Sequence, residues 1–208
     1  MDNVPTSPNP LRRNEASRRA ILDAALQLCA ELGYGRLTIE AIAARAGVSK
    51  KTIYRWWPSK GAVVLEAVND VATTVAEHPY SGDLATDLRT QLTAVIALLT
   101  PSNTSAVVGL IAEALHDDEL AQELRERLVR PRISAFNKRM HQAQLDGQLA
   151  ADADLDVAVD LVYGPLYHRL VFHLGMPDQE QLHTLVAHAL RALGQPAHDI
   201  ETKTPPTT

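Results

Sequence analysis

Features that mark secreted, membrane-spanning or disulfide-stabilised proteins are scarce in this 208-residue chain. It contains a single cysteine, Cys29, so no internal disulfide can form, and this usage fits a reducing compartment. No apolar run approaches the roughly 18 residues that a transmembrane helix needs, and residues 1–14 lack the apolar segment of a secretory signal. We therefore expect a cytoplasmic protein without a membrane partner, in which Cys29 is a buried structural thiol.

Motifs of catalysis are also missing, namely a glycine-rich phosphate loop and the G-x-S-x-G of hydrolases. Among the eight histidines, the pairs His168/His173 and His183/His188 are each five residues apart. In a helix this spacing places the two side chains roughly 140° apart around the axis, whereas metal-binding pairs share one face. We therefore expect neither an enzyme nor a metal or other cofactor.

An aspartate-rich run at 152–156 invites a calcium site. It lacks the glycine of a calcium loop, and Tyr163 stands where such a loop has its distal glutamate. We expect Asp154 instead to cap the helix that follows it.

Charge is distributed unevenly along the chain. The net charge of −5 argues against a nucleic-acid partner, but residues 1–60 carry ten Lys/Arg against five Asp/Glu, a balance of +5. Residues 61–208 carry the remaining ten Lys/Arg against twenty Asp/Glu. A nucleic-acid site is therefore expected within the first 60 residues, with the acidic remainder kept away from it.

Apolar residues recur at helical spacing along most of the chain, and no segment shows the alternation of a strand, so the sequence predicts an all-α fold of about nine helices. Gly33 and Gly194 are expected to end helices. The segment 105–115 is expected to be buried, and Pro131 to kink or divide the helix that contains it. The predicted helices are 14–32, 37–46, 49–57, 59 to about 76, 83–99, 105–115, 118 to about 144, 154–174 and 178–193.

The segment 38–60 has the pattern of two short helices joined by a tight turn. Thr38 is a good N-cap, Gly47 suits the left-handed conformation at a helix end, and Ser49 can cap a second helix that Pro58 stops. This arrangement predicts a helix-turn-helix, whose second helix can enter a DNA major groove.

The second helix of this pattern begins with Lys50 and Lys51, although the positive end of the helix dipole disfavours cations there. A DNA phosphate beside the two lysines would compensate for that repulsion. Positions that break a local stability rule are often functional, so we expect this helix end to contact DNA.

With these residues in view, the chain resembles the TetR family of bacterial transcriptional regulators, most strongly over residues 17–66. The segment 164–175, GPLYHRLVFHLG, is similar to the penultimate helix of a common TetR-like C-terminal domain. The matching N-terminal residues follow the family's order and spacing: Ile21, Ala25, Gly33, Thr38, Ile42, Ala43, Ala46, Gly47, Val48, Ser49, Tyr54 and Lys60.

The resemblance implies an all-α homodimer that binds operator DNA through its N-terminal domain and a small-molecule effector through its C-terminal domain. We accordingly expect a disordered arm at 1–12, a helix-turn-helix domain at 13–58, a ligand-binding and dimerisation domain at 59–194, and a flexible tail at 195–208.

The family's DNA contacts transfer to individual residues. Trp56 stands where the family often has histidine, and Trp57 where it usually has a buried phenylalanine. The plainer alternatives are an N-cap for Thr38, a core aromatic for Tyr54 and a solvated charge for Arg55 or Lys60. The residues implied in DNA binding are Thr38, Ser49, Lys50, Lys51, Thr52, Tyr54, Arg55, Trp56 and Lys60.

The predicted helix 154–174 is apolar on more than one side, so one side can face the core and another a second subunit. The alternative is a central core helix. The residues expected at the dimer interface are Leu161, Pro165, Phe172, Leu182, Val186 and Leu193. The residues expected to line a ligand pocket, each of which is alternatively plain core, are Ile96, Leu110, Phe136, Met140, Tyr163 and Tyr167.

These features favour a sequence-specific transcriptional regulator, a repressor that a small molecule releases from its operator. The alternative is a helical small-molecule-binding or adaptor protein without DNA binding. That alternative leaves the basic first 60 residues and the two dipole-opposing lysines unexplained.

Overall fold

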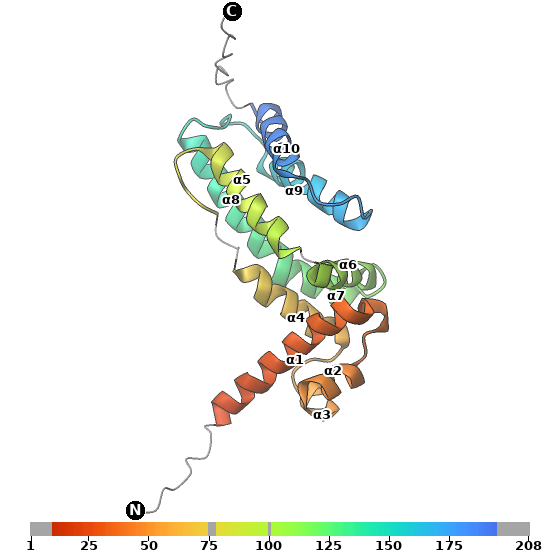
Figure 1. Cartoon of the computed structure of the whole chain (residues 1–208). Coiled ribbons are helices and arrows are strands. Elements are labelled where there is room, and N and C mark those ends of the chain that lie inside the picture. The colour runs from red at the N-terminus through yellow and green to blue at the C-terminus, as the bar shows by residue number, and fades with distance from the viewer. Residues whose placement is uncertain (1–9, 75–77, 100, 195–208) are drawn as a thin grey trace, which may run out of the picture. The chain divides into compact units, whose positions relative to one another are not determined.

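The computed structural model describes residues 10–74, 78–99 and 101–194, and over these residues the secondary structure is helical, with no β-strand (Figure 1). The predicted all-α fold is thus confirmed. Within the same residues no helix is long and apolar enough to cross a membrane. The α-helices are α1 (Pro10–Leu32), α2 (Ile39–Ala46), α3 (Lys50–Tyr54), α4 (Lys60–Thr73), α5 (Leu84–Leu98), α6 (Pro101–Ala114), α7 (Asp118–Leu124), α8 (Arg130–Leu145), α9 (Leu155–Val171) and α10 (Gln179–Ala192).

The chain divides into two compact units. Unit 1 combines 1–76 with 95–131 and contains α1 to α4, α6 and α7, whereas unit 2 combines 77–94 with 132–208 and contains most of α5 and α8 together with α9 and α10. The predicted 1–12 arm and 195–208 tail fall largely outside the described residues, although 10–12 belong to α1. The functional boundary predicted at 58/59 stays a prediction.

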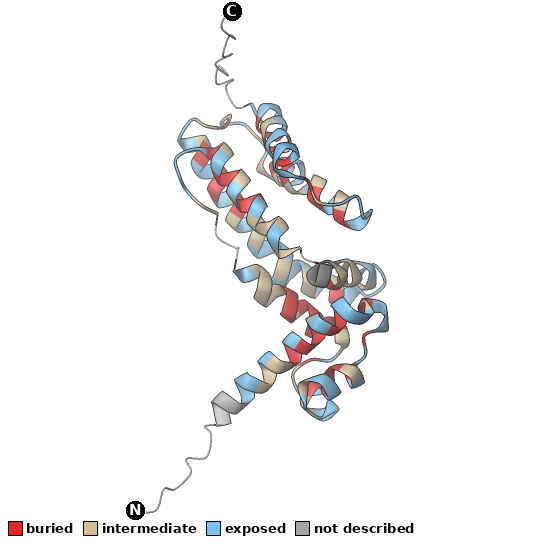
Figure 2. Cartoon of the chain, in the orientation of Figure 1, coloured by how far each residue is buried: buried red, intermediate tan, exposed pale blue. Residues whose placement is uncertain are grey.

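The core of unit 1 lies where α1 packs against α2, α4 and α6. Buried side chains of this core come from the second half of α1 and from α4 (Figure 2), and further ones from α2, α3, α6 and α7. Cys29 is fully buried there, as predicted, and burial raises the pKa of its thiol to about 11. A thiol with such a pKa stays protonated near neutral pH and is therefore unreactive.

Local capping forms the helix-turn-helix as the sequence predicts. The Thr38 hydroxyl accepts a hydrogen bond from the Ala41 N–H at 3.1 Å, and Gly47 ends α2 in the left-handed conformation with φ 66°. The Ser49 hydroxyl accepts from the Thr52 N–H at 3.1 Å and begins α3. Each cap satisfies a backbone group that the end of a helix leaves without a partner.

Two helices begin earlier than predicted, and both begin at a proline. α1 starts at Pro10 rather than near Asn14, and α6 starts at Pro101 rather than at Ser105. Proline is suited to the first helical position because its missing N–H needs no intrahelical partner there. The predicted helices 83–99 and 105–115 leave 100–104 outside any helix, and the structure corrects this for 101–104, which belong to α6.

Other corrections concern helix ends and burial. α3 ends at Tyr54 rather than Trp57; Pro58 disfavours helical conformation at Trp57, the residue before it, and Arg55 and Trp56 form a turn. The 105–115 segment is not wholly buried: Ala106 and Leu110 are, but Leu115 is 75% exposed.

The helix around Pro131 changes its type rather than ending. Residues Arg125–Val129 form a π-helical turn between α7 and α8, so the two helices are continuous. Pro131 has no N–H to donate, and its ring would clash with the preceding turn of a regular α-helix. The wider π turn accommodates both without ending the helix. With α7 and α8 counted as one, the described residues form nine helices, as predicted.

In unit 2, a buried ion pair joins α5 to α8. The Arg139 Nη2 atom lies 2.6 Å from Asp87 Oδ2, and both side chains are at most 4% exposed. Asp87 also accepts a hydrogen bond from the Ser81 N–H, which fixes the loop before α5. α8 meets α9 where the rings of Phe136 and Tyr163 pack edge to face at 5.6 Å.

Candidate nucleic-acid interface

The N-terminal end of α3 presents two exposed lysines, as predicted. Lys50 lies 2.9 Å from a carboxylate oxygen of Glu40 on α2, and this partner raises the pKa of its ammonium group. Lys51 is also exposed, and no ion pair is found for it among the described residues. Because Lys50 and Lys51 adjoin the free N–H groups of a helix start, this end of α3 is suited to bind an anion.

Tyr54 and Arg55 extend the same exposed region. Tyr54 is 54% exposed, which excludes the core-aromatic alternative, and its i, i+4 spacing places it on the same side of α3 as Lys50. Arg55 is exposed and its guanidinium carbon lies 5.1 Å from the ring centroid of Trp56. The four side chains Lys50, Lys51, Tyr54 and Arg55, called the recognition surface below, combine positive charge with donors that can reach DNA phosphates or bases.

The two tryptophans differ in role. Trp57 is 3% exposed, as expected for the family's buried aromatic position, whereas Trp56 is half-buried and packs against it at a centroid distance of 5.3 Å. The Trp57 indole donates a hydrogen bond to Glu66 Oε2 at 2.9 Å. Its burial and this hydrogen bond hold Trp57, and with it the chain directly after α3, against unit 1.

Glu66 on α4 is a structural residue that the sequence interpretation missed. Arg18 of α1 donates to its Oε1 at 2.7 Å, and Arg127 of the π turn donates to its Oε2 at 3.3 Å. Burial alone would raise the pKa of the Glu66 carboxyl, but the hydrogen bonds from Trp57, Arg18 and Arg127 outweigh burial and lower it. These partners lie up to 61 residues away, so no local sequence pattern indicates them.

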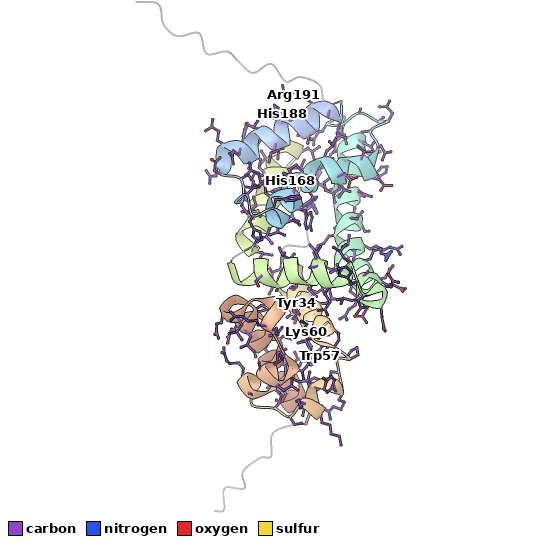
Figure 3. All side chains as sticks on the ribbon, turned by 90° about the vertical axis from the view of Figure 1, so that its right-hand side faces the viewer. Tyr34, Trp57, Lys60, His168, His188 and Arg191 are labelled. Carbon is purple, nitrogen blue, oxygen red and sulfur yellow. The ribbon has the colours of Figure 1, made fainter. Side chains whose placement is uncertain are left out.

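Lys60 begins α4, as the phosphate-binding interpretation requires, but its side chain is only 28% exposed. Its ammonium nitrogen lies 3.5 Å from Glu113 Oε2 of α6 and 4.6 Å from the ring centroid of Tyr34. Figure 3 shows Tyr34 and Lys60 next to each other, with Trp57 farther along the unit. In this conformation Lys60 is held by unit 1 rather than extended into solvent.

The residues expected to line a ligand pocket lie in both units. Ile96 is half-buried and Leu110 is part of the core of unit 1. In unit 2, Phe136 and Met140 are fully buried. The hydroxyl of Tyr163 shares a 3.1 Å hydrogen bond with His78 Nε2.

Tyr167 is 52% exposed, yet the surrounding protein raises the pKa of its hydroxyl. Burial lowers the pKa of the neighbouring Arg132 guanidinium, which interacts electrostatically with Tyr167.

A separate hollow of about 370 Å³ lies between the start of α9 and the end of α10. None of the six residues expected to line the ligand pocket belongs to it. Leu161 and Leu193, both expected at the dimer interface, do. Its lining residues are Ala150, Asp152, Ala153, Asp154, Val157, Leu161, Ala192, Leu193 and Gly194.

Of the six residues expected at the dimer interface, three are buried within a single chain. Leu182, Val186 and Leu193 are at most 6% exposed because the apolar stripe of α10 packs against α9. The expectation that they face a second subunit is therefore wrong for this structure. Leu161 and Phe172 are exposed, and Pro165 is half-buried.

The exposed apolar residues of α9 and its C-terminal end follow helical spacing. Val157, Leu161, Val171 and Phe172 are 48%, 39%, 42% and 65% exposed, and they share a face with Gly164 and His168. We call these six residues the α9 stripe. Such a stripe is unusual on a free surface and is typical of an interaction site.

The histidines and aspartates considered for a metal site do not converge. Among the described residues, no group of three His, Cys, Asp or Glu side chains is placed to hold a metal ion. Asp154 caps α9 by accepting hydrogen bonds from the N–H groups of Asp156 and Val157, as predicted. His168 packs beside Phe172, and Figure 3 shows it apart from His188.

Comparisons with known proteins agree with this arrangement. A family model described as "Bacterial regulatory proteins, tetR family" matches residues 21–67, and one described as "Tetracyclin repressor-like, C-terminal domain" matches residues 78–189. The HTH-type transcriptional regulator YdeS of Bacillus subtilis (strain 168) is 33% identical over 181 residues, which cover 87% of this chain and 91% of YdeS.

A Mycobacteroides abscessus protein described as "DNA-binding transcriptional repressor TetR" is 30% identical over 186 residues, covering 88% of this chain and 97% of that protein. The crystal structure of the TetR family transcription regulator SCO0332 superposes with a TM-score of 0.70 at 33% identity, covering 84% of this chain and 97% of that one. The chain is therefore a DNA-binding transcriptional regulator of the TetR family.

Proposed function

We propose that this regulator is a repressor, that it binds a palindromic operator as a homodimer, and that a small organic molecule releases it. The observation that carries the DNA-binding part is the recognition surface, where Lys50 and Lys51 stand exposed at a helix start. The description of the Mycobacteroides abscessus relative as a repressor supports the direction of regulation.

In the proposed complex, α3 lies in the major groove. Lys50, Lys51 and Arg55 supply charge to phosphates or base edges, and the exposed Tyr54 hydroxyl donates to a phosphate. Thr38 and Ser49 keep their capping roles at the starts of α2 and α3, where each adjoins free N–H groups that can also bind a phosphate. The remaining proposed contacts come from Thr52, Trp56 and Lys60.

The α9 stripe supports the proposed dimer. Burying it against the same stripe of a second copy would remove apolar side chains from water and give a two-fold interface. A two-fold dimer implies an operator whose half-sites are about one helical turn, or a multiple of it, apart.

The proposed effector site lies in unit 2 around Tyr163 and Tyr167. Tyr167 and Arg132 offer a half-polar wall beside the apolar Phe136 and Met140, which suits an organic molecule with a polar group. The FadR regulator of Bacillus subtilis, which shares the fold at 20% identity with a TM-score of 0.63, was solved in complex with stearoyl-CoA.

Selection of operator DNA from a random duplex pool tests the DNA-binding part directly. We expect a palindromic consensus whose binding weakens as salt concentration rises, because phosphate contacts release counterions. A protein that enriches no sequence and binds no duplex would contradict the proposal.

Thermal-shift screening of organic compounds, followed by operator-release assays, tests the effector part. Binding of effector and operator must be reciprocally coupled. We therefore expect the operator to weaken effector binding by the same factor by which the effector weakens operator binding. A compound that binds unit 2 but leaves operator affinity unchanged would contradict release by that compound.

A further inference from the structure

Lys60, Tyr34 and Glu113 form a cluster within unit 1, although they come from three separate segments of the chain. Lys60 begins α4, Tyr34 lies in the short 3₁₀ turn Tyr34–Arg36, and Glu113 is near the end of α6. The ammonium group lies between the Glu113 carboxylate, at 3.5 Å, and the face of the Tyr34 ring, at 4.6 Å. An ion pair and a cation–π contact thus hold the same lysine.

Two glycines make this cluster possible. A Cβ atom on Gly109 would lie 2.1 Å from Cγ of Tyr34, and a Cβ on Gly61 would lie 2.9 Å from Oε1 of Glu113. Any side chain at either position would therefore collide with a member of the cluster. The Tyr34 N–H also donates to the Ser105 hydroxyl at 3.3 Å, which ties the 3₁₀ turn to α6.

The shielding of the Lys60–Glu113 pair distinguishes it from the Lys50–Glu40 pair of the same unit. Lys60 and Glu113 side chains are 28% and 29% exposed, whereas Lys50 and Glu40 are 55% and 64% exposed. Solvent screens an exposed pair strongly and a partly shielded pair less. The charge of Lys60 is therefore more firmly engaged than that of Lys50.

We propose that Glu113 competes with operator phosphate for Lys60, so that α6 sets how much positive charge the start of α4 offers to DNA. This inference rests on the proposed phosphate contact of Lys60. A phosphate that binds Lys60 must displace or share the Glu113 carboxylate, and the lost ion pair reduces the gain from the phosphate. Glu113 is thus a positioning residue that acts through Lys60.

The competition predicts that Glu113→Gln tightens operator binding, because glutamine keeps the shape of the side chain and removes the competing charge. Glu113→Gln removes the cost of breaking one weak ion pair in each subunit. For a dimer this corresponds to a roughly 2- to 30-fold gain in operator affinity. The log–log salt dependence should also steepen, by up to about 0.9 per subunit, because Lys60 then releases a counterion on binding.

The experiment uses the full-length protein, the selected operator and fluorescence anisotropy at several salt concentrations. Glu119→Gln, at an exposed acid of α7, is the matched control because it changes the net charge equally. Lys60→Met should weaken binding, and in the Lys60→Met background Glu113→Gln should have no further effect. Glu113→Asp, which retracts the charge but keeps it, should fall between the wild type and Glu113→Gln.

Several outcomes would overturn the inference. They are a gain from Glu113→Gln no larger than from Glu119→Gln, the same gain in the Lys60→Met background, or a Lys60→Met protein that binds like the wild type. Thermal unfolding checks that each variant is folded, and Glu113→Asp serves if Glu113→Gln is not. A Lys50→Ala/Lys51→Ala protein that still loses operator affinity would show that DNA binding through α3 stands even where this inference fails.

Discussion

The ammonium group of Lys50 on α3 lies 2.9 Å from the carboxylate of Glu40 on α2, so the two helices of the helix-turn-helix share an ion pair across their turn. Lys51, the next residue, is exposed without such a pair among the described residues. Two adjacent lysines that composition treats alike therefore differ in how freely they can meet a phosphate.

We predict that Lys51→Ala weakens operator binding more than Lys50→Ala does. Lys50 must give up part of its contact with Glu40 to bind DNA, whereas Lys51 need not. Each substitution should reduce the log–log salt slope by about 0.9 per subunit if the lysine meets a phosphate. Affinities measured over a salt series test this, and unchanged affinity in the double alanine variant would contradict the recognition surface.

Gly109→Ala should destabilise unit 1, because the new Cβ would stand 2.1 Å from the Tyr34 ring. Overpacking of this kind costs about 1–3 kcal/mol, which exceeds the helix-propensity gain of about 1 kcal/mol. Urea unfolding of the full chain measures the difference in the free energy of unfolding.

The matched control for this substitution is Gly35→Ala. Gly35 lies in the 3₁₀ turn of the same unit, outside the left-handed region of φ, and a Cβ there would meet no heavy atom within 4 Å beyond its chain neighbours. We expect this substitution to leave stability unchanged or to raise it slightly. Equal effects of the two substitutions would show that the contact between Tyr34 and α6 is not tight.

Stability should fall in acid partly through His78. Burial is the main cause that lowers the pKa of its imidazole to about 4, with Arg139 adding to the effect and Asp87 opposing it. An unfolded histidine has a pKa of about 6.5. As the pH falls, the unfolded chain therefore binds the proton before the folded chain does. The contribution of neutral His78 to the free energy of unfolding is complete above about pH 6.5 and is lost as the pH falls towards about 4.

His78→Gln should make the stability–pH curve shallower in that window, by at most about 1.4 kcal/mol per pH unit. Urea unfolding at several values between pH 7 and pH 4 measures this slope. His183→Gln, at an exposed position of α10, is the control and should leave the slope as in the wild type. A His78→Gln curve parallel to that of the wild type would contradict the assignment.

The proposed dimer should dissociate when the α9 stripe carries charge. Leu161→Lys places two like charges in a two-fold interface, once from each subunit, and we expect a dissociation constant at least about tenfold higher. Analytical ultracentrifugation measures it. Leu115→Lys, at a leucine of unit 1 that is 75% exposed, is the control. If Leu161→Lys raised the dissociation constant no more than Leu115→Lys does, the dimer would have another interface.

The sequence predicted those features that neighbouring residues determine. Thr38, Ser49 and Asp154 were recognised as caps, and Gly47 as a helix end, because each depends on atoms within one helical turn. The starts at Pro10 and Pro101 lie earlier than predicted because the sequence interpretation placed neither proline as a first helical residue.

Contacts between distant segments could not be predicted in the same way. Lys60 was correctly placed at the start of α4, but its partner Glu113 is 53 residues later. Two partners of Glu66, Arg18 and Arg127, are likewise 48 and 61 residues away. Likewise, the apolar stripe of α10 was recognised, but periodicity alone does not show whether such a stripe faces its own chain or another. Leu182, Val186 and Leu193 face their own chain.

The assembly of unit 1 from two stretches of sequence limits how this regulator can be re-engineered. Residues 1–76 supply α3, the helix proposed to read DNA, but Ala106 and Leu110 of α6 complete the core of unit 1. The ring of Tyr34 packs against Gly109 of the same helix α6. A chimera that grafts only the first 76 residues onto another regulator would join them to a foreign α6. Its operator specificity could transfer only if the recipient also carried 95–131 or an α6 with glycine at the place of Gly109.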